Sequence, residues 1–83
     1  MADRIKNVIE LMSTLEEDTS IPKNIRKAIN EAKARMTEEG DIKVRTSNAV
    51  YLLDSVSEDI NMPTHARTQI WTILSELETI REE

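Results

Sequence analysis

Residues 17–26 read Glu-Asp-Thr-Ser-Ile-Pro-Lys-Asn-Ile-Arg, and residues 58–67 read Glu-Asp-Ile-Asn-Met-Pro-Thr-His-Ala-Arg. The prolines of the two segments, Pro22 and Pro63, are 41 residues apart. Each segment follows an apolar run of helical period and precedes another such run. The sequence therefore predicts two copies of one helix-turn-helix unit.

Apolar residues recur along the chain at spacings of three and four, which is typical of helices with one buried face. We expect a first helix from about residue 4 to about residue 17 with Asp3 as its N-cap, and a second helix with Pro22 in its first turn. The second helix should end near Glu39, since the single glycine, Gly40, suits a left-handed C-cap, and Asp41 can cap the third helix. A fourth helix should follow Pro63. The expected buried positions are Ile5, Val8, Ile9, Met12 and Leu15; Ile25, Ala28, Ile29, Ala32 and Met36; Ile42, Ala49, Val50, Leu53 and Val56; and Ala66, Ile70, Ile73, Leu74, Leu77 and Ile80.

The predicted fold is all-α, a four-helix array or bundle made of two repeated antiparallel helical hairpins. No segment alternates strictly between apolar and polar residues, so strands have no support. Short links force neighbouring helices to run antiparallel. We expect one domain over residues 1–83, with unit one at about 4–39 and unit two at about 42–82. Neither hairpin can bury its apolar face alone, so the two must share one core.

The turns carry a resemblance to known repeats. The first turn, with an acidic residue at the end of the first helix, resembles the inter-helix turn of a HEAT-type helical repeat in Pro22, Ile25, Arg26 and Ala28. The second turn resembles it less closely. Asp59, Pro63 and Arg67 match the pattern, but Ala66 stands where the first turn has the larger aliphatic residue Ile25. The resemblance implies a scaffold for protein partners, and a polar ladder that joins Asp18 and Asp59 to Arg26 and Arg67. The whole sequence also resembles a family of uncharacterised small acidic archaeal proteins that fold as compact helical arrays, which implies a fold and no activity. Two units are few for an open solenoid, so a closed bundle or self-association is expected.

The charge of the chain makes nucleic acid an improbable partner. Eleven Lys and Arg against sixteen Asp and Glu give a net charge of −5, whereas phosphate contacts need a basic face. An alternative remains open, a nucleic-acid-associated accessory protein that uses the basic positions of the second helix: Lys23, Arg26, Lys27, Lys33 and Arg35. The chain has no cysteine, no signal-type apolar segment and no stretch suited to a membrane, so we expect a cytoplasmic protein.

No combination of residues predicts catalysis. His65 is the only histidine, and without cysteine it has no strong second ligand for a metal ion. The carboxylates lie in runs such as Glu38-Glu39 that are typical of solvated surfaces, and one glycine cannot form a phosphate loop. We therefore expect no enzyme activity, no cofactor, no metal and no small-molecule substrate.

Two aromatic residues of the second unit stand out. Trp71 shares a stripe with Arg67 and Leu74 at the side of the main apolar face, and Tyr51 lies beside Leu52. The repeat partners of the two aromatic residues are polar, Asn30 and Glu10. Tyr51, Arg67, Trp71 and Leu74 are therefore candidates to anchor a protein partner or a second copy of the chain. Alternatively, the aromatic side chains close the end of the core. The predicted function is a non-enzymatic protein–protein interaction or structural module.

Overall fold

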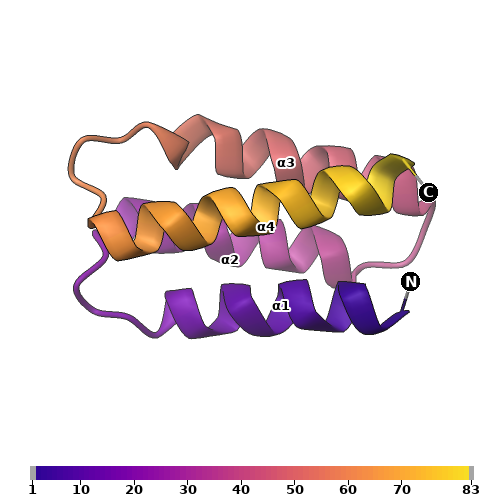
Figure 1. Cartoon of the computed structure of the whole chain (residues 1–83). Helices are drawn as coiled ribbons and strands as arrows, with labels where there is room; N and C mark the ends of the chain where they lie inside the picture. Colours follow the sequence, from indigo (N-terminus) through magenta and orange to yellow (C-terminus); the bar gives the residue numbers. More distant parts are fainter. Residues whose placement is uncertain (1, 83) are drawn as a thin grey trace.

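The structure, a computed structural model, describes residues 2–82, and this range forms four α-helices and no strand (Figure 1). The helices are α1 (Ala2–Glu16), α2 (Lys23–Thr37), α3 (Ile42–Ser57) and α4 (Thr64–Glu82). The predicted all-α fold is confirmed. None of these helices has both the length and the hydrophobicity needed to cross a membrane.

The helices close into a ring. Helix α1 packs against α2 and α4, and α3 packs against the same two helices, while within residues 2–82 no Cα atoms of diagonally opposed helices come within 8 Å of each other. Both repeated turns lie at one end of the molecule, and the two termini and the α2–α3 link lie at the other (Figure 1). The hairpins α1–α2 and α3–α4 therefore form a closed four-helix bundle rather than an open stack.

The core is aliphatic, and every helix contributes to it. All five positions predicted for α2 are buried, and so are all those predicted for α4 except Leu74. The equivalent residues Ile29 and Ile70 are both 0% exposed. Five predicted positions are only partly buried and pack against the margin of the core: Ile5, Ile9, Ile42, Val56 and Leu74. Three buried residues escaped prediction: Ile21 and Met62, each directly before a proline, and Thr46 of α3, whose hydroxyl donates to the backbone carbonyl of Ile42 at 2.5 Å.

The helix starts differ slightly from the prediction. Helix α1 begins at Ala2, so Asp3 lies in its first turn, where the helix dipole favours a carboxylate, and is not the N-cap. Pro22 precedes α2 at the N-cap position, with φ −54° and ψ 148°, instead of lying in the first turn. Its carbonyl accepts hydrogen bonds from the backbone N–H groups of Ile25 and Arg26 at 3.1 and 3.0 Å, and so starts the helix.

The link between the hairpins also differs in part. Helix α2 ends at Thr37, because Glu38 adopts an extended conformation with φ −73° and ψ 161°. Gly40 has the expected positive φ, 124°, but it lies in the link and does not cap the helix. Asp41 caps α3 as predicted, since its side chain accepts a hydrogen bond from the backbone N–H of Lys43 at 2.8 Å.

Truncation of either central isoleucine tests the shared core. Ile29→Ala and Ile70→Ala should each lower the free energy of unfolding by about 2–5 kcal/mol, and by similar amounts, because both side chains leave equivalent cavities in one core. Urea denaturation followed by circular dichroism measures this. Thr72→Ala, at an exposed position of α4, is the control and should change stability by less than about 0.5 kcal/mol. A loss below about 1 kcal/mol for one isoleucine alone would contradict equal roles.

Candidate functional site

Both turns form the same internal hydrogen bonds. The carboxylate of Asp18 accepts from the backbone N–H of Ser20 at 2.9 Å, and that of Asp59 accepts from the backbone N–H of Asn61 at 2.8 Å. Each aspartate thus closes a turn with the residue two positions on. The repeat seen in the sequence extends to the backbone.

The two turns also contact each other across the bundle. Asp18 Oδ2 lies 2.7 Å from His65 Nε2, and Asn24 Nδ2 donates to Asp59 Oδ2 at 3.4 Å. Asn24 and His65 are 41 residues apart, like the two aspartates, so the contacts are one interaction repeated by an approximate twofold relation between the hairpins. The pair of contacts holds the hairpins in register at this end of the bundle.

The contacts around Asp18 keep its carboxyl group ionised. Hydrogen bonds from the Ser20 hydroxyl, then from His65 and from the Ser20 backbone, lower the pKa of Asp18 from 3.8 to about 2. His65 completes an ion pair when its imidazole is protonated. The sequence offered no partner for His65. The 41-residue repeat identifies Asn24 as the equivalent position in the first unit. The contact with Asp18 follows only from the tertiary fold.

The arginines of the turns make a different contact from the one predicted. Arg26 Nε donates to the backbone carbonyl of Ile21 at 3.0 Å, and Arg67 Nη2 donates to the backbone carbonyl of Asp59 at 2.9 Å. The expected ladder to aspartate carboxylates is therefore not the observed arrangement, because those carboxylates already bind their own turns and the opposite hairpin. Each arginine instead closes the turn of its own unit.

The described residues do not present a set of side chains that could bind a metal ion. Within residues 2–82, no group of three His, Cys, Asp or Glu side chains is arranged to hold a metal ion. Asp18 and His65 lack a third such partner there and bind each other. The contacts observed at the turns join the two hairpins.

The outer surface of the second unit is unusually hydrophobic. The large exposed hydrophobic residues in the described range are Val44, Tyr51, Ile60 and Trp71, with exposures of 59, 75, 91 and 58%. All of them belong to the second unit, and their repeat counterparts are Asp3, Glu10, Thr19 and Asn30. Tyr51 and Trp71 therefore do not complete the core, which was one of the two interpretations of the sequence.

The partner-binding candidates do not form one cluster. Tyr51 borders Glu31 and Arg35, so it faces α2. Trp71 is the counterpart of Asn30, which hydrogen-bonds Glu16 on the neighbouring helix of its own hairpin at 2.8 Å. The twofold relation between the hairpins therefore indicates that Trp71 lies on the side of α4 toward α3. Leu74 is half-buried against the core and Arg67 binds its turn. Of the candidates on α4, Trp71 alone is exposed.

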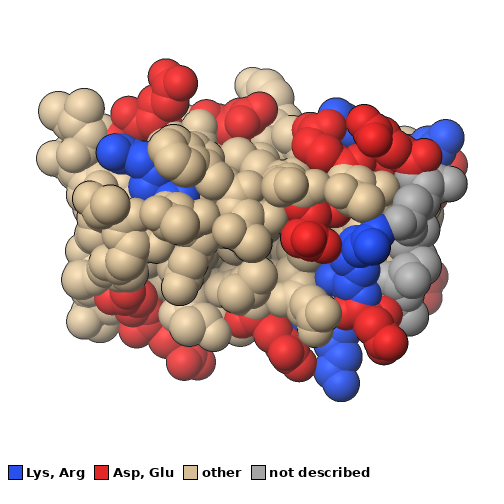
Figure 2. All heavy atoms as spheres, viewed as in Figure 1, with Lys and Arg blue, Asp and Glu red and all other residues tan. Residues whose placement is uncertain are grey.

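The face of the molecule formed by α4 has few charged side chains at its centre (Figure 2). Figure 2 shows a broad uncharged area there, with acidic and basic side chains gathered at its ends and edges. Residues 68–75 of α4 contain no Asp, Glu, Lys or Arg. An ion pair between Arg4 and Glu76, with a distance of 3.4 Å from Nε to Oε2, borders this area toward α1.

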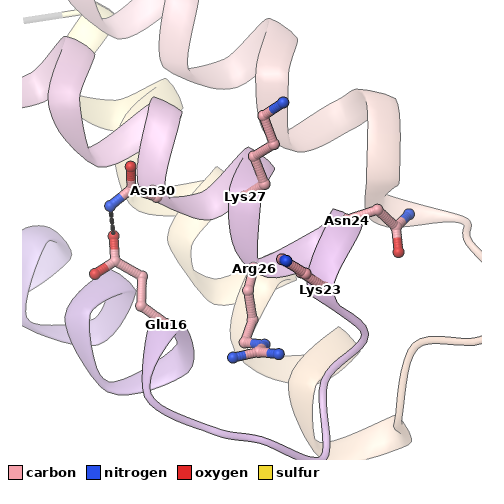
Figure 3. Close-up of a pocket in the computed structure, with 6 residues that line it drawn as sticks. All are labelled: Glu16, Lys23, Asn24, Arg26, Lys27 and Asn30. Atoms are coloured by element: carbon pink, nitrogen blue, oxygen red, sulfur yellow. Dashed lines mark hydrogen bonds between the residues drawn. The ribbon is translucent and has the colours of Figure 1, made fainter.

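The basic positions of α2 divide into two sets. Lys33 pairs with Glu16 at 2.7 Å and Arg35 pairs with Glu38 at 2.7 Å. The other three line an open groove of about 710 Å³ beside α1 and α2 (Figure 3). The groove residues are Glu16, Lys23, Asn24, Arg26, Lys27 and Asn30.

Comparison with known proteins places the chain among relatives of similar length. The model of the uncharacterised protein family UPF0147 matches residues 1–80. A UPF0147 protein of Methanocaldococcus jannaschii is 44% identical over 78 residues, which cover 93% of this chain and 84% of that protein. A UPF0147 protein of Saccharolobus islandicus is 41% identical over 80 residues, covering 95% and 90%.

Two crystal structures share the fold. One, of a UPF0147 protein from Thermoplasma acidophilum, matches with a TM-score of 0.89 and 32% identity and covers 95% of this chain and 94% of that one. The other, of a protein of unknown function, matches with a TM-score of 0.89 and 49% identity and covers 94% and 90%. The bundle is thus a shared architecture, while the likeness of its turns to HEAT-type repeats stays a prediction.

Replacement of Asp18 tests the contact between the turns. Asp18→Asn should lower the free energy of unfolding at neutral pH, because the folded protein holds the pKa of this carboxyl below its unfolded value. That stabilisation is complete above the unfolded pKa and disappears as the pH falls from 3.8 to about 2, so the two proteins should become equally stable there. Urea denaturation at a series of pH values measures the difference.

Glu17→Gln provides the matched control for this experiment. The neighbouring carboxylate of Glu17 is exposed and has no hydrogen bond or ion pair within residues 2–82. The control should therefore show no comparable pH-dependent difference. A difference between Asp18→Asn and the original protein that stays constant down to pH 2 would contradict the assigned contact.

Proposed function

The chain belongs to the uncharacterised protein family UPF0147, and we propose that it is a non-enzymatic protein-interaction module that binds another protein through the outer face of α4 around Trp71. The observation that carries this proposal is the distribution of exposed hydrophobic side chains. In the described range, every large one lies in the second unit, where the first unit has polar residues. The core does not require the exposed side chain of Trp71, and a partner that covers it would remove this apolar surface from water.

Trp71 has the properties of an interface anchor. Its side chain is 58% exposed and belongs to the stretch of α4 without charges, residues 68–75. Burial of this surface by a partner removes apolar area from water and desolvates no ionised group in residues 68–75. Tryptophan is among the residues that most often dominate the binding energy of an interface.

The charge of the molecule indicates the chemistry of the partner. Carboxylates gather at the edges of the uncharged area, and the whole chain carries a net charge of −5 (Figure 2). A partner that presents an apolar or aromatic side chain flanked by Lys or Arg complements this surface. A second copy of the chain would set one acidic rim against another, so a different protein fits better.

The alternative, a nucleic-acid-associated accessory protein, has weaker support. Lys33 and Arg35 are held in ion pairs, which leaves Lys23, Arg26 and Lys27 as the available part of the basic strip. Three cations offer few phosphate contacts along a strand. Binding of a fluorescent oligonucleotide at low salt, measured by anisotropy, would favour this alternative.

Removal of the Trp71 side chain tests the proposed interface. Trp71→Ala should weaken binding of the partner at least tenfold, because the anchor contributes more than about 2 kcal/mol in a typical interface. Because the side chain is 58% exposed, the free energy of unfolding should fall by less than about 1 kcal/mol. Affinity capture from an archaeon that carries a family member supplies the partner, and calorimetry with the purified partner gives the affinity.

Tyr51→Ala is the matched control, since it removes an exposed aromatic side chain on the other flank of α3 and should leave this binding intact. A loss of more than about 3 kcal/mol of stability in Trp71→Ala would show a core residue and overturn the proposal. A concentration-dependent dimer that Trp71→Ala abolishes would also overturn it, in favour of self-association.

A further inference from the structure

We propose that the groove beside α1 and α2 is a binding site for a small phosphorylated ligand. This site belongs to the first hairpin and is independent of the protein-binding face of α4. Three cationic side chains line it, those of Lys23, Arg26 and Lys27, within a chain that is acidic as a whole.

The positive charge of the groove is not compensated within it. Glu16 is the only carboxylate of the lining, and it already accepts hydrogen bonds from Lys33 Nζ at 2.7 Å and from Asn30 Nδ2 at 2.8 Å. Lys23 and Lys27 make no ion pair with residues 2–82. An anion that enters the groove therefore meets ammonium groups whose attraction is not already used by neighbouring carboxylates.

Arg26 gives the groove a fixed donor. Its Nε donates to the Ile21 carbonyl at 3.0 Å, which anchors the guanidinium and leaves the N–H groups of its two terminal nitrogens for a ligand. In Figure 3, Lys23 lies near Arg26, whereas Lys27 points away from it. The flexible four-carbon stem of lysine allows Lys27 to turn toward a bound anion.

The start of α2 adds to this potential. Pro22 occupies the N-cap position and forms no side-chain cap, so the first backbone N–H groups of the helix have no side-chain acceptor. The positive end of the helix dipole favours an anion near Lys23 and Asn24. The dipole strengthens a site that the three cations define.

The second unit shows that the fold does not require these cations. Thr64 and Thr68 occupy the positions equivalent to Lys23 and Lys27, and Trp71 replaces Asn30. The two hairpins share their turn geometry and their buried positions, yet only one carries the basic groove. The fold therefore does not depend on the two lysines, which leaves them available to a ligand.

The size and the chemistry of the groove indicate the class of ligand. The groove is open to solvent and broad enough for a small molecule to lie against α1 and α2. Lysine and arginine together favour a phosphate group, which they bind through charge-assisted hydrogen bonds. Asn24 and Asn30 each donate one amide N–H to a carboxylate, of Asp59 and Glu16, so their carbonyl oxygens and second amide N–H groups are what they can offer to the rest of the ligand. A phosphomonoester or diphosphate of a small organic molecule fits these features.

Titration by NMR tests the proposal with pyrophosphate and AMP as probes and adenosine as the uncharged control. Both phosphorylated probes should cause saturable shifts of the backbone amides of residues 23–30, and adenosine should cause none. The variant Lys23→Thr/Lys27→Thr, which copies the second unit, should bind at least tenfold more weakly. Its fold should persist, because α4 accommodates threonine at the same two positions.

The variant Lys6→Thr/Lys43→Thr is the matched control, since it removes the same charge from exposed positions outside the groove and should retain binding. If both double variants lose the same affinity for the phosphorylated probes, the binding depends only on the total charge of the protein, and the proposal is overturned. Shifts that do not saturate, or that spread evenly over all lysines, would overturn it as well. Tenfold tighter binding of an oligonucleotide than of pyrophosphate would assign the groove to nucleic acid instead. None of these outcomes depends on Trp71, so this proposal and the proposed function fail separately.

Discussion

The structure depends on the mutual burial of two hairpins that cannot cover their own apolar faces. Each helix packs against two neighbours in a closed ring, and central residues such as Ile29 and Ile70 are removed from water entirely. The core contains no aromatic side chain, so its cohesion comes from aliphatic packing alone. A domain of this size buries a modest share of its surface, and the margin of stability is correspondingly small. The contacts between the turns join the hairpins at one end of the bundle and add little to this burial.

The approximate twofold relation holds in the interior and fails at the surface. Ile29 and Ile70 fill equivalent places, and both turns form the same hydrogen bonds. On the outside, Lys23 and Lys27 correspond to Thr64 and Thr68, and Asn30 corresponds to Trp71. Packing constrains both units alike, whereas an exposed side chain is free to differ. The differences between the two outer surfaces are therefore the part of the molecule that folding does not explain, and it is on them that the two proposed binding sites rest.

The sequence predicted the helices and most of the core, because apolar spacing along a helix decides which residues can be buried together. It placed the helix ends less well. Asp3, Pro22 and Gly40 are each compatible with more than one position near a terminus, and the competing arrangements differ by about one hydrogen bond. The contact between Asp18 and His65 joins residues from opposite hairpins, so it needs the ring to be closed first. The exposure of Trp71 was undecided for a similar reason, since a residue beside the main stripe is buried or exposed according to how the next helix packs.

Closure of the ring also determines how such a molecule can bind. An open repeat protein offers a concave surface that grows with the number of repeats. Here the inner faces of the helices are buried in the core. Only outer faces and inter-helix grooves remain. The uncharged stretch of α4 covers eight residues, or about 12 Å of helix axis, so a partner that uses this stretch alone gains a small interface. Such a contact suits transient binding or one edge of a larger assembly. The basic groove lies on the other hairpin, so a ligand there and a protein on α4 do not compete for the same surface.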